Sequence, residues 1–229
     1  LAIMDGAYVT RANMIGAKMN WVDLSGSSLT TCQFTRSEFF GADLSNSDLT
    51  GSDFTRAYLV RANLSGSTLK NANLAYADLT GANLSNAKMS NVRLENVFLN
   101  EADLSGADLT GCYFSSMAFN GIVARNAELR SSSMAMLTII DGDFVDSDLR
   151  DVRFSQTYMN NTNFSGADLS GAVFETTAFE NADFSGANLE GVKYDPIALA
   201  FFARSRLDGA KISLNLQEDL EELRSGRTA

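Results

Sequence analysis

The sequence predicts an all-β solenoid, in which the chain winds through a stack of similar coils around one apolar core. Two observations lead to this fold class. A large, mostly apolar residue recurs every five residues from Met4 to Tyr194 with no insertion or deletion, and a small residue usually stands two positions before it. Five residues advance an α-helix by about 500°, so the large residues would be spread around the whole helix instead of lying on one face. In a flat strand alternate large residues would face opposite sides, because five is odd. The chain must therefore bend once in every repeat.

The large residues, called centres below, define the core. There are 39 of them, of which eighteen are Leu, eleven are Phe and six are Met. The other four are Val9, Ala124, Ile139 and Tyr194. The position two residues before each centre is most often Ala or Ser, and Cys32 and Cys112 also stand there. This alternation of large and small inward positions predicts one continuous core along the whole repeat region.

The recurring motif A(D/N)LxG, as in ADLSGADLTG at residues 102–111, resembles the pentapeptide-repeat family over about residues 2–195. The resemblance implies a right-handed quadrilateral β-helix with four sides and 20 residues in each coil. About ten coils would then stack at roughly 4.8 Å per layer, with Leu29 and Leu49 in one column. The two cysteines would lie four coils and roughly 19 Å apart, so they are expected to be free, buried thiols.

The alternation loosens between residues 115 and 142. Met117, Ile122 and Leu137 occupy the small position, and Ala124 occupies a centre. One interpretation is volume compensation, in which a large neighbour fills the space that a small centre leaves. The alternative is a locally distorted coil that a partner recognises.

The period stops after Tyr194, where the only proline appears, so we divide the chain into a β-helix (1–195) and a C-terminal helical cap or tail (196–229). A first helix is expected with Asp195 as N-cap, Pro196 at its first position and Gly209 just past its end. A second is expected with Asn215 as N-cap. These helices would cover the open end of the last coil. The alternative is dimerisation, either through this helical end or through the uncapped N-terminal end. The apolar residues that we expect in a helical cap or dimer contact are Phe201, Phe202, Leu216, Leu220 and Leu223.

Composition argues against several functions. The chain has no histidine, which removes the commonest general base and metal ligand, and no catalytic cluster or glycine-rich phosphate loop is found. We therefore expect a protein that is not an enzyme and holds no cofactor and no metal. A net charge of −10 argues against direct nucleic-acid binding. No apolar run reaches the roughly 18 residues that span a bilayer, so membrane insertion is not expected.

Charge is distributed unevenly over the four sides. The side that holds Leu24, Leu44 and Leu104 carries seven aspartates against Arg125, a net charge of −6, and the other three sides carry −2, +1 and −3. This predicts an acidic face for a partner. The residues of that face are Asp23, Asp43, Asp103, Asp143, Asp146 and Asp183.

The favoured function is a non-catalytic scaffold that presents flat, partly acidic faces to an unidentified protein partner. The resemblance also implies an alternative, a DNA mimic that binds a type II topoisomerase, although Asn63, Asn83 and Asn163 interrupt the aspartate row. The motif style is similar to that of cyanobacterial and chloroplast members, which implies the thylakoid lumen or the cytoplasm. Trp21 is expected at an outward corner, as a contact point or as shelter for the N-terminal coil.

Overall fold

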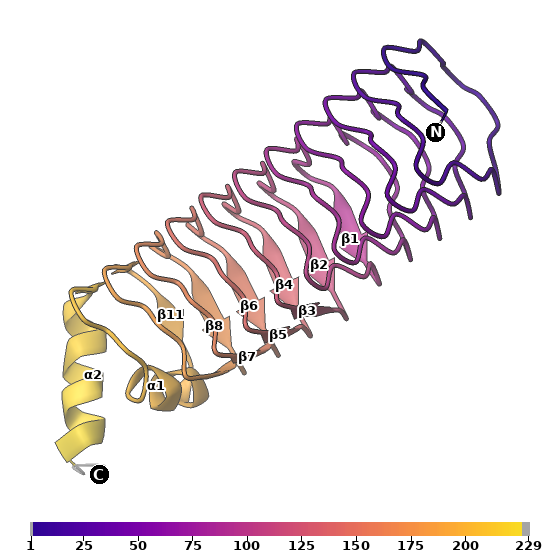
Figure 1. The fold of residues 1–229 in the computed structure, drawn as a ribbon. Helices are drawn as coiled ribbons and strands as arrows, with labels where there is room; N and C mark the ends of the chain where they lie inside the picture. Colours follow the sequence, from indigo (N-terminus) through magenta and orange to yellow (C-terminus); the bar gives the residue numbers. More distant parts are fainter. Residues whose placement is uncertain (1, 226–229) are drawn as a thin grey trace.

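The chain forms a rod of stacked coils that ends in two helices, as the computed structural model in Figure 1 shows; residues 2–225 are described. The coils follow one another from the N-terminal end to the yellow helices, so the termini lie at opposite ends of the rod. The β-solenoid predicted from the five-residue period is confirmed.

Residues twenty apart pair with each other along the rod. In one column Ile3 pairs with Asp23, which pairs with Asp43, and in the next Ser28 pairs with Asp48. All of these pairings are parallel, and the same offset continues as far as Lys193, which pairs with Val173. One coil therefore takes 20 residues. We call its sides first, second, third and fourth, with the centres Leu24, Leu29, Phe34 and Phe39 and every twentieth residue from each.

The centres form the core. From Leu24 to Leu189 each centre side chain exposes 2% or less of its surface, including Ala124 and Ile139. Cys32 and Cys112 are free and buried in the small inward position, as predicted. Ile122, next to Ala124, is buried as well, which is what volume compensation requires of that pair.

The bend in each repeat is a left-handed backbone conformation two residues after the centre. Every residue at this corner position from Gly6 to Gly191 has a positive φ. In the described chain all 24 non-glycine residues with positive φ stand at such corners, with φ between 50° and 63°. Asn is the commonest among them, with eight of the 24, and its short polar side chain tolerates this region.

Regular strands occupy only part of the rod. The third side forms a six-stranded parallel sheet in the order β1-β2-β4-β6-β8-β11, and the fourth side forms a four-stranded sheet in the order β3-β5-β7-β9. The strands of the first sheet are Arg93–Glu95, Tyr113–Ser115, Ser133–Ala135, Arg153–Ser155, Val173–Glu175 and Lys193–Tyr194. Those of the second are Ala118–Asn120, Thr138–Ile140, Tyr158–Asn160 and Ala178–Glu180. Regular ladders thus cover about six coils, fewer than the ten expected, and the layers nearer the N-terminus pair through isolated bridges.

The corner between the third and fourth sides explains where the strands appear. In the N-terminal half a small inward residue closes a tight turn, as when the Ala57 N–H donates to the Phe54 carbonyl at 2.8 Å. At Ser116, Met136, Gln156 and Thr176 the corner is an open bend instead. The inward residues that follow these bends are large or β-branched, namely Met117, Leu137, Thr157 and Thr177. The segments that flank these bends are the strands of the two sheets.

The first C-terminal helix is shorter than expected. α1 spans Pro196–Phe202, with the Asp195 side chain accepting a hydrogen bond from the Ala198 N–H. The expectation that this helix reaches Gly209 is wrong, because the chain returns to the solenoid after Phe202. Arg206 pairs with Asp183, 23 residues earlier. β12 (Lys211–Ile212) pairs with β10 (Asn188–Leu189) with the same offset.

The second helix, α2 (Leu214–Ser225), packs against α1 at the end of the rod. It begins at Leu214, so Asn215 lies inside its first turn and is not the N-cap. Leu216 and Leu220 are buried, whereas Leu223 is 37% exposed.

The helices meet the last coils through aromatic rings. Phe202 is fully buried, with ring centroids 5.2 Å from Phe174, 4.7 Å from Phe179 and 5.3 Å from Phe184. Phe201 is half-buried, with its ring 5.7 Å from that of Phe179. α1 therefore extends the core beyond the last complete coil.

Candidate partner-binding faces

Five of the six aspartates predicted for an acidic face lie in one row on the first side. Asp23, Asp43, Asp103, Asp143 and Asp183 share one column of bridged residues, in which only Asp23 and Asp43 are direct neighbours. The residues between the others are Asn63, Asn83, Val123 and Asn163. Asp146 does not belong to this row, because it stands at an exposed corner with φ 56°.

Each aspartate of the row also holds its own turn together. The Asp23 Oδ1 accepts the backbone N–H of Ser25 at 3.0 Å, and the Asp103 Oδ1 accepts that of Ser105 at 2.9 Å. Asp43, Asp143 and Asp183 accept in the same way from the residue two positions on. Hydrogen bonds from the backbone and the hydroxyl of Ser25 lower the pKa of Asp23. Asparagine does the same work in this column, where the Asn63 Oδ1 accepts from Ser65. These carboxylates thus stabilise the turns, and one oxygen of each accepts a hydrogen bond within its own turn.

The row is partly neutralised toward the C-terminus. The Arg125 Nε lies 2.6 Å from the Asp143 Oδ2, and Arg206 lies 3.2 Å from Asp183. Among the described residues, ion pairs with Asp23, Asp43 and Asp103 are absent. The uncompensated charge of the first side is therefore concentrated toward its N-terminal half.

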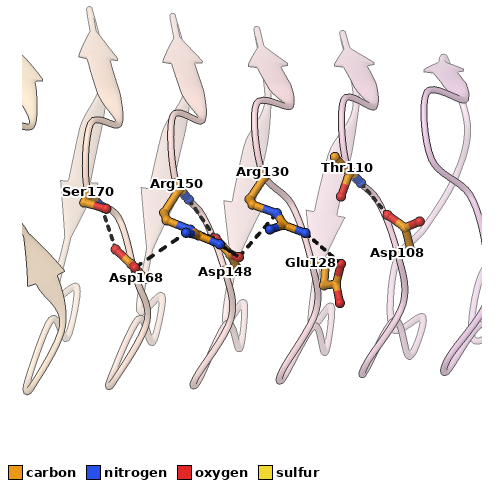
Figure 2. Close-up of polar contacts among 8 residues, drawn as sticks. All are labelled: Asp108, Thr110, Glu128, Arg130, Asp148, Arg150, Asp168 and Ser170. Atoms are coloured by element: carbon orange, nitrogen blue, oxygen red, sulfur yellow. Dashed lines mark hydrogen bonds and ion pairs between the residues drawn. The ribbon is translucent and has the colours of Figure 1, made fainter.

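The second side carries a chain of ion pairs that neutralises itself, shown in Figure 2. Arg130 contacts Glu128 at 3.2 Å and Asp148 at 3.4 Å, in the next coil. Arg150 contacts Asp148 at 2.7 Å and Asp168 at 3.9 Å. The hydrogen bonds from Arg150 lower the pKa of Asp148, and the same contact raises the pKa of Arg150. Because each arginine lies between two carboxylates, this stretch offers little net charge to a partner.

The fourth side exposes aromatic rings, a feature that sequence analysis recognised only for Trp21. The exposed fractions are 56% for Trp21, 42% for Tyr58, 55% for Phe98 and 37% for Tyr158. The rings of Trp21 and Phe40 lie 5.1 Å apart. The signal was present in the sequence, because this side places aromatics directly beside its centres where the other sides mostly carry Asp, Asn, Ser or Thr.

The described residues contain neither a candidate metal-binding cluster nor a helix that could span a membrane. Between residues 2 and 225 no three His, Cys, Asp or Glu side chains are grouped so as to hold a metal ion. Neither helix in that range is long and apolar enough to cross a membrane. The Cys112 thiol is not an activated nucleophile, since burial raises its pKa to about 12.

Comparison with known proteins agrees with the fold. The family model described as pentapeptide repeats matches in eight copies, and the matches include residues 2–30, 17–56, 37–75, 69–106, 87–123 and 157–193. A comparison with curated proteins gives no match.

Three solved structures are among those similar to the chain. One is QnrB1, a plasmid-mediated fluoroquinolone resistance protein, with 20% identity over 94% of this chain and 97% of that one and a TM-score of 0.51. Another is HetL, involved in heterocyst differentiation regulation in the cyanobacterium Nostoc sp. strain PCC 7120, with 23% identity, 92% and 86% coverage and a TM-score of 0.48. The third comes from the Arabidopsis thaliana thylakoid lumen, with 26% identity, 50% and 66% coverage and a TM-score of 0.23. With its five-residue period, its twenty-residue coils and a family model that matches most of its length, this chain belongs to the pentapeptide-repeat family.

Proposed function

We propose that the protein is a non-catalytic scaffold that binds a protein partner along one side of its rod. The observation that carries this proposal is the chemical difference between sides built on the same core. The first side carries a row of carboxylates, the second a self-neutralising chain of ion pairs and the fourth exposed aromatic rings. A rigid core holds each of these strips in fixed register, which is the arrangement a protein interface needs.

A DNA mimic that binds a type II topoisomerase is the rival function. Its support is the aspartate row, whose members recur in register with the coils. Against it stand Arg125 and Arg206, which pair with Asp143 and Asp183 and break the charge pattern. The likeness to QnrB1 supports the fold and adds no weight to this function.

Capture of partners by side-specific variants tests the scaffold. The triple variant Asp23→Asn, Asp43→Asn, Asp103→Asn removes charge from the first side and keeps the turn hydrogen bonds, because asparagine already fills this column at Asn63. The matched control makes the same change at three aspartates of the second side, Asp48→Asn, Asp108→Asn and Asp168→Asn. Extracts of the thylakoid lumen or of cyanobacterial cytoplasm are the first sources to use, given the motif style.

The expected result is a protein that is retained by the wild type and lost on substitution of one side only. A fourth-side variant, Tyr58→Thr with Phe98→Thr, completes the set, because that side exposes both rings. Equal retention by the variants of all three sides, or no saturable partner at all, would contradict the scaffold. A gyrase supercoiling assay with the protein titrated in tests the rival. We expect neither inhibition nor protection from a quinolone, and either effect would favour the DNA mimic.

A further inference from the structure

Acidic and aromatic residues alternate in the N-terminal half of the fourth side. Glu38, Tyr58, Asp78 and Phe98 occupy four successive layers and are joined by parallel bridges, each to the next. Tyr58 and Phe98 are exposed, and Glu38 and Asp78 are half-buried at the surface between them. The alternation repeats every two layers, which is roughly 9.6 Å at one strand spacing per layer.

The carboxylates of this ladder form no ion pair among the described residues, although Lys18 precedes Glu38 in the same column and is bridged to it. Glu38 accepts a hydrogen bond from the neutral amide of Asn20 at 2.9 Å, and Asp78 accepts the backbone N–H of Thr80 at 3.0 Å. In the described part of the chain no Lys or Arg nitrogen lies within 4.0 Å of either carboxylate. This contrasts with Asp148 on the second side, which has two arginine partners. The fourth side as a whole carries a net charge of −3.

The aromatic residues nearby already contact a cation. The guanidinium of Arg56 lies over the ring of Tyr76, 5.5 Å from its centroid, at the corner beside this side. A hollow of about 640 Å³ opens next to Phe98, with Tyr76, Met136 and Thr138 in its lining. Exposed rings next to unpaired carboxylates suit a partner that brings both positive charge and compact apolar groups.

We propose that the fourth side binds an extended, proline-rich segment of another protein with Lys or Arg at every third residue. This inference rests on the proposed scaffold function and names the side and the chemistry of its partner. A polyproline II helix has three residues per turn and rises about 3.1 Å per residue, so its pitch of about 9.3 Å matches the two-layer repeat. One cation would meet Glu38 and the next Asp78, while the prolines between them pack on Tyr58 and the prolines after the second cation pack on Phe98.

Synthetic peptides test the spacing. The probe is a fluorescently labelled peptide of repeated Arg-Pro-Pro units, titrated with the full chain at low ionic strength while anisotropy is measured. Two control peptides accompany it, one with the same number of arginines separated by three prolines and one with glutamine in place of arginine. We expect saturable binding of the first peptide, weaker binding of the second and none of the third.

Two variants test the side. Glu38→Gln with Asp78→Asn keeps the hydrogen-bond acceptors and removes both charges, and should weaken binding about tenfold. Tyr58→Thr with Phe98→Thr removes the rings, and is compatible with the fold because Thr138 fills the same column. The matched control, Asp48→Asn with Asp108→Asn, makes the same change in net charge on the second side and should leave binding unchanged.

Three outcomes would overturn the inference: no binding of the Arg-Pro-Pro peptide, equal affinity for the peptide with wider spacing, or equal weakening by the second-side control. The last would reduce the effect to the overall negative charge. None of these would affect the scaffold itself, whose test is the loss of a captured protein on substitution of any one side. If that capture fails while the peptide binds as expected, the scaffold proposal fails on its own.

Discussion

The indole of Trp21 lies directly over the backbone of Gly41, one coil further along the rod. A Cβ built on Gly41 would overlap the ring atoms Cζ3 and Cε3 of Trp21, and Gly41 has a φ of 61°. The ring also meets Phe40 edge to face. Trp21 thus covers the corner of the next coil although it is 56% exposed.

Gly41→Ala should therefore destabilise the chain by more than left-handed strain alone. We expect a loss of about 2–3 kcal/mol, of which about 1–2 kcal/mol is the cost of the left-handed conformation. The measurement is urea unfolding followed by Trp21 fluorescence. Gly26→Ala is the matched control, since Gly26 has the same conformation and nothing within 4 Å of an added Cβ. Equal losses in the two variants would mean that the ring moves aside without cost.

Phe202→Ala should remove the junction between α1 and the last coils. The side chain is fully buried among three other phenylalanines, so we expect a loss of about 3–5 kcal/mol. The measurement is thermal unfolding, with light scattering to report exposure of the open end of the core. Leu223→Ala on α2, where 37% of the side chain is exposed, serves as the control and should cost much less. If light scattering instead shows a wild-type dimer that Leu223→Ala disrupts, the helical end is a dimer contact.

Arg150→Gln should raise the pKa of Asp148 back toward its ordinary value near 3.8. The hydrogen bonds from Arg150 now hold that pKa down, so the stability that Asp148 contributes is present above its unfolded pKa. It is lost as the pH falls through the lower folded value. An NMR titration of the side-chain carboxyl measures the shift. Arg93→Gln on the third side is the control, and an unchanged Asp148 titration in Arg150→Gln would show that the ion pair does not form in solution.

Cys112 should make the protein sensitive to alkaline pH. Its pKa rises from 9.0 to about 12 on folding because the thiol is buried. The unfolded chain therefore loses a proton at a pH at which the folded chain keeps it. The contribution is constant below pH 9 and falls by up to about 1.4 kcal/mol per pH unit above it. Cys112→Ala should flatten this part of the curve, and urea unfolding below and above pH 9 measures it. A thiol that reacts with an aromatic disulfide reagent in the folded protein near neutral pH would contradict the burial.

Most of the fold could be predicted from the sequence because one rule acts at every coil. The unbroken centres and the small residues before them set the core, and the burial of Leu24 through Leu189 follows directly. The return of the chain after α1 was missed because its offset is 23 and not 20, although RLDGAKI at residues 206–212 repeats the motif with Leu207 and Ile212 as centres. The segment that contains α1 accommodates the three additional residues.

The candidate faces were less predictable than the core. The aspartate row could be found by counting charge on each side. The hydrogen bonds of these aspartates within the turns and the ion pair with Arg125 depend on three-dimensional contacts. The aromatic residues of the fourth side could have been found by reading the positions on either side of each centre in steps of twenty. The ion-pair chain at Arg130 and Arg150 depends on side-chain reach between coils, which residue types alone do not specify.

The detour through α1 shows how loosely one edge of the square is constrained. Between Asp183 and Arg206 the backbone leaves the stack, forms a helix and then rejoins the stack in register. This coil uses three residues more than a regular coil of 20. The neighbouring layer constrains only the two ends of this segment, which pair with it in register. An edge of such a rod can therefore take up extra residues without loss of register, so we expect a loop grafted at this edge to leave the stacked layers intact.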